Sequence, residues 1–173
     1  MTDAHAPVPD HIRPGLRVLF IGFNPSLRSG ETGHNYANPN NRFWRILQGS
    51  GLTPRLYRPE EDGDLLELGY GFTNIVARPT RAADEITREE YREGRSLLRR
   101  KLEKAKPRVA CYVGKGVYEE FRGSRGRIPW GFQEEETVNG VKDFVAPSSS
   151  GLVRMKLEEM IDIYKELEAY LNG

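Results

Sequence analysis

Four short apolar segments, separated by stretches of mixed polarity, constrain the fold of this chain more than any other feature. They cover residues 18–23, 70–76, 109–113 and 142–146, and Asn, Pro, Gly or Ser residues that form turns follow each one closely. The last amphipathic stretch, residues 157–171, carries one apolar stripe at helical spacing. Because strands that alternate with helices form βαβ units, we expect an α/β fold whose mostly parallel, four-stranded sheet is covered on both faces.

Capping residues predict where some of the helices begin and end. Thr87, with Glu90 three residues later, has the capping-box pattern, and the helix that it opens is expected to reach about Lys106. A second helix is expected within residues 38–49, with Asn38 or Asn40 as its cap.

The length of 173 residues is typical of a single domain, and 38% hydrophobic residues with both charge signs indicate an ordinary globular protein. We expect a flexible tail over residues 1–14 and one domain over residues 15–173. The tail is polar and has no apolar signal core, and no stretch approaches the roughly 20 apolar residues of a membrane span. We therefore expect a cytoplasmic monomer that does not bind membranes.

The single cysteine, Cys111, excludes a disulfide framework and any zinc or iron–sulfur site built from several thiolates. It lies in an apolar segment, where a thiol is usually a small buried hydrophobe, and we expect neither a metal nor a cofactor. A net charge of +1 means that binding to nucleic acid would need a local basic face. The glycine-bearing segment with Arg122, Arg125 and Arg127 is our candidate for contact with phosphate.

Ligands of parallel α/β sheets bind beyond the carboxyl ends of the strands. In this chain, that rule brings together Asn24-Pro25, Arg78-Pro79-Thr80, Gly114-Lys115 and Pro147–Arg154. We therefore expect the functional site where these four segments meet.

Asn24 is held at the end of the first strand, because Pro25 excludes the helical conformation at the residue before it. Its amide can orient a water molecule and bind a carbonyl edge, or it can cap its own backbone as in an ordinary Asn-Pro turn. A phosphate-binding loop that uses nearby glycines is disfavoured, because their spacing fits neither the Walker nor the dinucleotide pattern.

Two further segments at this edge of the sheet have open alternatives. Tyr36 can stack on a base or pack its own loop onto the core, whereas Phe43 and Trp44, at helical spacing, are expected in the core. The serines before Leu152 can cap the last helix. Leu152 itself can be a wedge between base pairs or a hydrophobic staple in the core.

Five segments occur in the same order as in one known family. They are Gly22-Phe23-Asn24-Pro25, residues 33–44 ending in Asn41-Arg42-Phe43-Trp44, Thr73–Thr80, Val113-Gly114-Lys115, and Pro147–Arg154. Together they resemble the mismatch-specific uracil-DNA glycosylase and thymine-DNA glycosylase family, from Gly15 to about Tyr170. The resemblance implies a three-layer αβα sandwich of the uracil-DNA glycosylase type.

The resemblance also implies roles for individual residues. Asn24 matches the residue that positions the attacking water, Tyr36 the aromatic that stacks on the flipped base, and Phe23 a source of backbone contacts to that base. Three residues match the wedge that fills the gap in the duplex and contacts the widowed guanine: Gly151, Leu152 and Arg154.

Two positions depart from the family pattern. Ser26 stands where many members have glycine, and Ser148, a candidate base-binding residue, stands where some bacterial members have asparagine. The triple serine of residues 148–150 instead resembles the thymine-processing branch.

We therefore expect a monofunctional DNA glycosylase of base-excision repair. It would flip uracil, or a related damaged base, out of double-stranded DNA opposite guanine and hydrolyse the N-glycosidic bond. Asp84 is an alternative activator of water, with a solvated loop carboxylate as the simpler interpretation. A module that binds flipped bases without cutting them and an unrelated α/β nucleotide-binding enzyme are the other hypotheses.

Overall fold

A five-stranded sheet forms the centre of the computed structural model, which describes residues 5–123 and 126–173. The strands are β1 (Val18–Gly22), β2 (Tyr70–Asn74), β3 (Val109–Val113), β4 (Gly131–Phe132) and β5 (Lys142–Ala146). Their order is β2-β1-β3-β5-β4; all pairs are parallel except β4 with β5.

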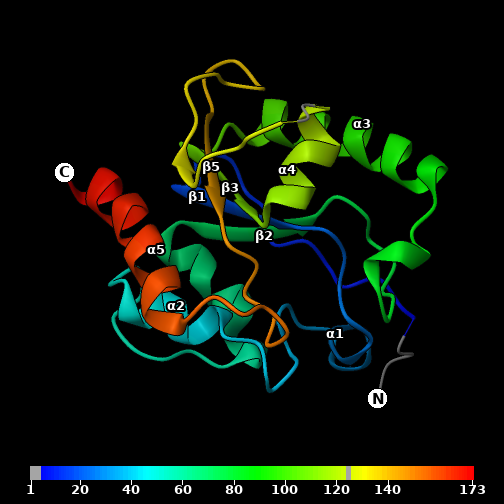
Figure 1. The fold of residues 1–173 in the computed structure, drawn as a ribbon, viewed down its shortest axis with the longest axis horizontal. Coiled ribbons are helices and arrows are strands. Elements are labelled where there is room, and N and C mark those ends of the chain that lie inside the picture. The colour runs from blue at the N-terminus through cyan, green and yellow to red at the C-terminus, as the bar shows by residue number, and fades with distance from the viewer. Residues whose placement is uncertain (1–4, 124–125) are drawn as a thin grey trace.

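Helices cover both faces of this sheet (Figure 1). The α-helices are α1 (Leu27–Thr32), α2 (Phe43–Gly49), α3 (Arg88–Ala105), α4 (Lys115–Arg122) and α5 (Leu157–Asn172), and two 3₁₀ helices, η1 (Pro59–Leu68) and η2 (Ala83–Glu85), lie in the connections. Helices α2 and α5 pack on one face and α3 and α4 on the other, which makes the three-layer αβα sandwich.

The pleat of the strands divides the core into two clusters. On β1, Val18 and Phe20 face the layer of α2 and α5, whereas Leu19 and Ile21 face the layer of α3 and α4. All four side chains are fully buried, as expected for a parallel strand with helices on both sides. Burial on both faces explains why the segment is continuously apolar and does not alternate.

The predicted α/β class and the four parallel strands are confirmed, but the sheet has a fifth strand. Strand β4 has only two residues and pairs antiparallel with β5 through Gly131 and Phe132. Two residues are too short to show a period of two, so the sequence pattern contained no signal for this strand.

The capping box of Thr87 and Glu90 is present, and α3 has Lys106 as its C-cap. The prediction for residues 38–49 was wrong at its start: α2 begins at Phe43, and neither Asn38 nor Asn40 caps it. The hydroxyls expected to cap α5 also do not do so, because its N-cap is Lys156 and the serines lie several residues upstream.

Part of the segment expected to be a tail pairs with the edge of the sheet. The backbone of His11 exchanges two hydrogen bonds of 2.9 Å with Phe72 of β2, and Val8 is buried. Asp10 pairs with Lys101 of α3 at 2.6 Å. In the described residues, no helix is long and apolar enough to cross a membrane.

Candidate active site

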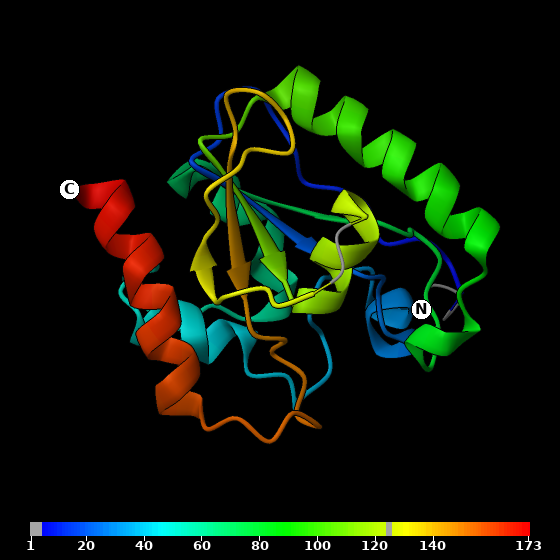
Figure 2. The same cartoon turned by 45° about the horizontal axis from the view of Figure 1, so that its top comes forward.

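A cavity of about 870 Å³ opens beyond the carboxyl ends of the parallel strands. In Figure 2 the segment after β5 and the segment before α2 meet there. The cavity is lined by residues 22–26, Ser29, Asn35, Tyr36, residues 38–42, Arg45, Asn74, Arg81, Val113 and residues 148–152. Its size falls within the range of small-molecule sites.

The amide of Asn24 has a defined orientation in this cavity. Its Nδ2 donates to the carbonyl of Arg78 at 2.9 Å and to Oγ1 of Thr80 at 2.8 Å. Thr80 donates its only hydroxyl proton to the carbonyl of Ala82 at 2.9 Å, so Oγ1 must accept from Asn24. Both amide hydrogens are therefore used within the protein, and Oδ1 remains as the atom that can accept a hydrogen bond from a ligand or water.

An ion pair behind this contact fixes the position of Arg78. Its guanidinium donates to Glu90 of α3 at 2.7 and 2.9 Å and to the carbonyl of Glu85 at 3.0 Å. These bonds hold the pKa of the Glu90 carboxyl at about 2, below its ordinary value of 4.5. The N-terminus of α3 thereby anchors the carbonyl that orients Asn24.

Tyr36 lines the cavity and also packs against the core. Its ring stacks on Phe43 with centroids 4.0 Å apart and planes 13° apart. Its backbone has the left-handed conformation (φ 50°), which is uncommon outside glycine. Burial raises the pKa of the Tyr36 phenol above its ordinary value of 10.0, at which the hydroxyl is already neutral at pH 7.

Hydrogen bonds on both sides of Tyr36 hold this unusual conformation. The indole of Trp44 donates to the carbonyl of Tyr36 at 3.1 Å. The backbone N–H and the side-chain amide of Asn35 both donate to Oδ2 of the buried Asp62, at 2.9 and 3.0 Å. Conformations of this kind persist only where their surroundings over-determine them.

The ring of Phe23 lies away from the centre of the cavity, against the layer of α3 and α4. It contacts Tyr91 edge-on at 6.3 Å, and a Cβ added to Gly116 would lie 2.5 Å from it. The carbonyl of Phe23 accepts from the backbone N–H of Val76 at 2.9 Å, so the backbone N–H of Phe23 is the polar group left for a ligand.

Leu152 is 94% exposed, which excludes the alternative that it packs into the core. It lies in residues 148–155, which we term the wedge loop. Arg42 donates to three carbonyls of this loop, those of Ser150, Val153 and Met155. Gly151 is close to Asn40, because an added Cβ would lie 2.8 Å from the Asn40 carbonyl.

The structure brings six of the eight predicted site residues to the cavity, together with lining residues for which the sequence predicted no role. Asn24, Phe23, Tyr36, Ser148, Gly151 and Leu152 line the cavity. Asp84, in η2, and Arg154 are exposed and do not line it. Asn74, Arg45 and Arg81 are among these further lining residues, and of the three only Asn74 had a signal, since it is a polar residue within the second apolar segment.

The cavity lining contains no carboxylate and no lysine among the residues that the structure describes. The charged groups in the lining are the guanidinium groups of Arg42, Arg45 and Arg81. The cavity is therefore suited to an anionic or polar ligand.

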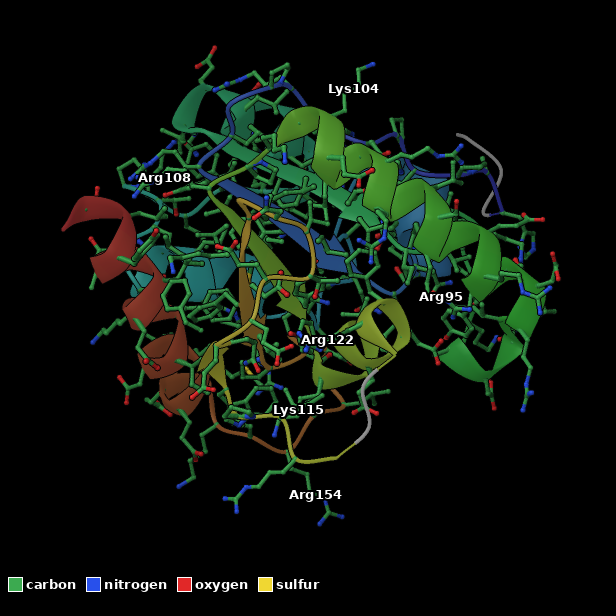
Figure 3. All side chains as sticks on the ribbon, turned by 90° about the horizontal axis from the view of Figure 1, so that it is seen from above. Arg95, Lys104, Arg108, Lys115, Arg122 and Arg154 are labelled. Carbon is green, nitrogen blue, oxygen red and sulfur yellow. The ribbon has the colours of Figure 1, made fainter. Side chains whose placement is uncertain are left out.

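The segment with Arg122, Arg125 and Arg127, predicted to contact phosphate, is only partly available for such a contact. Arg122 forms an ion pair with Glu135 and donates to the hydroxyl of Tyr118. The basic segment contains no carboxylate itself, but Glu135, 13 residues after Arg122, pairs with one of its arginines. Arg127 is exposed, and Arg125 lies outside the described residues. Figure 3 shows Arg154 projecting beyond the wedge loop, on the side opposite Lys104 and Arg108.

Comparison with known proteins identifies the family. The model of the uracil DNA glycosylase superfamily matches residues 9–172. The chain belongs to the uracil DNA glycosylase superfamily. Among solved structures, it is similar to an NMR structure from Methanosarcina acetivorans provisionally called a uracil DNA glycosylase. The TM-score is 0.62, with 22% identity over 95% of this chain and 98% of that one, which supports the same fold.

Membership of the uracil DNA glycosylase superfamily makes the chain a DNA glycosylase, a hydrolase that acts on DNA. The alternative of an unrelated α/β nucleotide-binding enzyme is therefore wrong. The motifs around Asn24 and before Leu152 lie within the matched residues, at the cavity where the fold places a ligand.

Proposed function

We propose that this glycosylase is a monofunctional enzyme of the mismatch-specific type that removes uracil, or a related damaged base, opposite guanine in duplex DNA. It leaves an abasic site and acts as a cytoplasmic monomer in base-excision repair. The observation that carries the proposal is the oriented amide of Asn24 in a cavity whose described residues include neither carboxylate nor lysine.

The amide of Asn24 supports a hydrolysis in which water is positioned but not deprotonated in advance. The C1′–N bond breaks with its electron pair leaving on the base, a water oxygen bonds to C1′, and the released proton passes to solvent. Oδ1 of Asn24 can accept a hydrogen bond from that water. An amide cannot act as a base at pH 7, so the enzyme forgoes the roughly 10²–10⁴-fold of general base catalysis and its chemical step is slow.

The absence of lysine from the described lining supports the monofunctional assignment. A glycosylase that also cuts the strand needs an amine that attacks C1′ and forms a Schiff base. The charged groups of the lining, those of Arg42, Arg45 and Arg81, are guanidinium groups and not amines. Among the described lining residues there is thus no amine nucleophile, which leaves the reaction to water.

Three parts of the cavity can hold a flipped base. Tyr36 offers an aromatic surface fixed by its stack on Phe43, and stacking of a base on such a side chain contributes about 1–3 kcal/mol. The amide of Asn74 lies beside Gly22 and has both a donor and an acceptor, which match the alternating edge of uracil. Backbone N–H groups of Phe23 and Asn24 can stabilise the departing anion.

The exposed Leu152 supports extrusion of the base by a wedge. Flipping costs a few kcal/mol and costs least for a mispaired base, so a wedge that fills the gap favours mismatches. Arg154, two residues further on, projects into solvent, where it can contact the widowed guanine or a phosphate.

The test is a single-turnover assay on a duplex with one G·U pair, followed by alkali and detection of strand cleavage. We expect cleavage by the wild type, a loss of roughly 10²–10³-fold with Asn24→Ala, and a smaller loss with Leu152→Ala. Asn139→Ala and Leu97→Ala are matched controls, because both residues are exposed and lie outside the cavity. They should keep the wild-type rate.

Each outcome of this assay has a distinct meaning. Cleavage that persists in Asn24→Ala and disappears in Asp84→Ala would transfer activation of water to Asp84. Strand cleavage without alkali would exclude the monofunctional mechanism. Failure to cut uracil, hypoxanthine or ethenocytosine in any pairing, with binding retained, would leave a protein that only senses lesions.

A further inference from the structure

We propose that Arg42 is a positioning residue that holds the wedge loop in the conformation that presents Leu152 to the duplex. The inference rests on the proposed function for the role of Leu152, but the contact between Arg42 and the loop does not depend on it. Arg42 itself is not proposed to touch the reacting atoms.

Four hydrogen bonds from Arg42 span the wedge loop. Nη1 donates to the carbonyl of Met155 at 2.9 Å, and Nη2 donates to those of Ser150 at 2.8 Å and Val153 at 2.9 Å. The backbone N–H of Arg42 also donates to the carbonyl of Ser149 at 2.9 Å. The accepting carbonyls lie on both sides of Leu152, so one guanidinium holds both ends of the exposed tip.

The hydrogen bonds that the wedge loop makes within itself are longer. Val153 N to the Ser150 carbonyl and Leu152 N to Ser150 Oγ are both 3.2 Å, and Ser150 N to Ser148 Oγ is 3.4 Å. Bonds from a charged donor are roughly twice as strong as neutral ones. The conformation of the loop therefore depends more on Arg42 than on the loop's own contacts.

The rigid geometry of the guanidinium suits this task. Its nitrogens are fixed in one plane and reach three carbonyls at once, whereas the ammonium of lysine is a single flexible donor group. The Nε of Arg42 is buried and has no partner among the described residues, which is a cost that the three carbonyl bonds offset. A surface arginine bound only to solvent would not carry this cost.

Arg42 also connects the wedge loop to the base-binding part of the cavity. It is the N-cap of α2, and the next residue, Phe43, stacks on Tyr36. The residue that holds Leu152 and the residue that supports the aromatic surface are thus adjacent in the chain. This arrangement sets the distance between the wedge and the pocket that receives the base.

The first test measures amide hydrogen exchange across the wedge loop in the free, full-length protein. In Arg42→Lys, we expect exchange of residues 149–155 to become at least about tenfold faster while α3 and β3 keep their protection. Arg92→Lys, an exposed arginine of α3 paired with Glu89, is the control and should change nothing in the loop. Unchanged exchange in Arg42→Lys would overturn the proposal.

The second test separates positioning from a general loss of structure. Single-turnover cleavage by Arg42→Lys should fall about tenfold or more on G·U, but much less on uracil opposite an abasic site, where extrusion needs little help. In a Leu152→Ala background, the same substitution should cost less than it does alone. Equal losses on both duplexes, or additive losses in the double variant, would show a merely structural role.

Gly151→Ala keeps the proposal testable if Arg42→Lys does not fold. The added Cβ would lie 2.8 Å from the Asn40 carbonyl and displace the wedge loop without altering Arg42. It should reproduce the substrate-dependent loss, and equal losses on both duplexes would contradict the proposal. If the wild type cuts no uracil-containing duplex, the proposed function fails, while the exchange measurement still decides whether Arg42 holds the loop.

Discussion

Asp62 is a buried carboxylate outside the cavity whose loss we expect to destabilise the fold. It lies in η1 with its side chain 2% exposed. Its Oδ2 accepts both hydrogen bonds from Asn35, and its Oδ1 lies 3.1 Å from Nδ1 of His34 and 3.3 Å from Nε2 of His11. One carboxylate therefore joins the N-terminal segment to the loop that carries Tyr36.

The loss of stability expected for Asp62→Ala follows from the hydrogen-bond donors of Asn35 that it leaves without an acceptor. Asn35 is 5% exposed, so water cannot replace the lost acceptor for its N–H or its amide. An unsatisfied buried donor costs about 1–3 kcal/mol, so two such donors lower the free energy of unfolding by about 2–6 kcal/mol. His34 adds little, because its side chain is partly exposed and can bind water, whereas the buried Nε2 of His11 adds to the loss.

Urea unfolding at pH 7 measures this loss. Asp62→Ala should lower the midpoint at an unchanged m-value, and Asp62→Asn, which keeps an acceptor oxygen for Asn35, should lose much less. Asp64→Ala is the control, because Asp64 lies in the same 3₁₀ helix and is exposed, so its change should stay within about 0.5 kcal/mol. A loss below about 1 kcal/mol for Asp62→Ala would refute the argument.

Three further predictions follow from individual contacts. Gly22→Ala should reduce cleavage of G·U in single-turnover assays and change the melting temperature little. The new Cβ would lie 2.6 Å from Oδ1 of Asn74, a side-chain atom that can move. A large loss of stability would contradict this reason. The bonds from Arg78 lower the pKa of Glu90 to about 2. The contribution of ionised Glu90 to the free energy of unfolding is therefore fully present above pH 4.5 and is lost as the pH falls toward 2. Glu90→Gln should therefore make the free energy of unfolding in urea less dependent on pH between 2 and 4.5. An unchanged pH dependence would count against a stabilising role of the Arg78–Glu90 ion pair. Burial raises the pKa of the Cys111 thiol, so iodoacetamide should label it only after denaturant is added, and labelling of the native protein would show that the thiol is accessible.

Local patterns in the sequence predicted the class of fold and the edge of the sheet at which the cavity lies. A parallel strand buried on both faces is mostly apolar, so the four long strands were visible as predominantly apolar runs, although β5 also contains Lys142 and the buried Asp143. The capping box of Thr87 and Glu90 was equally visible, because both partners lie within one turn of helix. Since parallel strands end at the same edge, these runs were enough to predict that Asn24 and the wedge loop would line one cavity.

The contacts that orient the site could not be predicted in this way. Asn24 donates to residues 54 and 56 positions away, and Arg42 to carbonyls 108 to 113 positions away. Asp62 binds Asn35 from 27 positions away. Every residue has a backbone carbonyl, so the sequence does not mark which ones a guanidinium or an amide will bind. The periodicity of the chain determined which segments are buried, and only their packing in three dimensions decided which polar atoms meet.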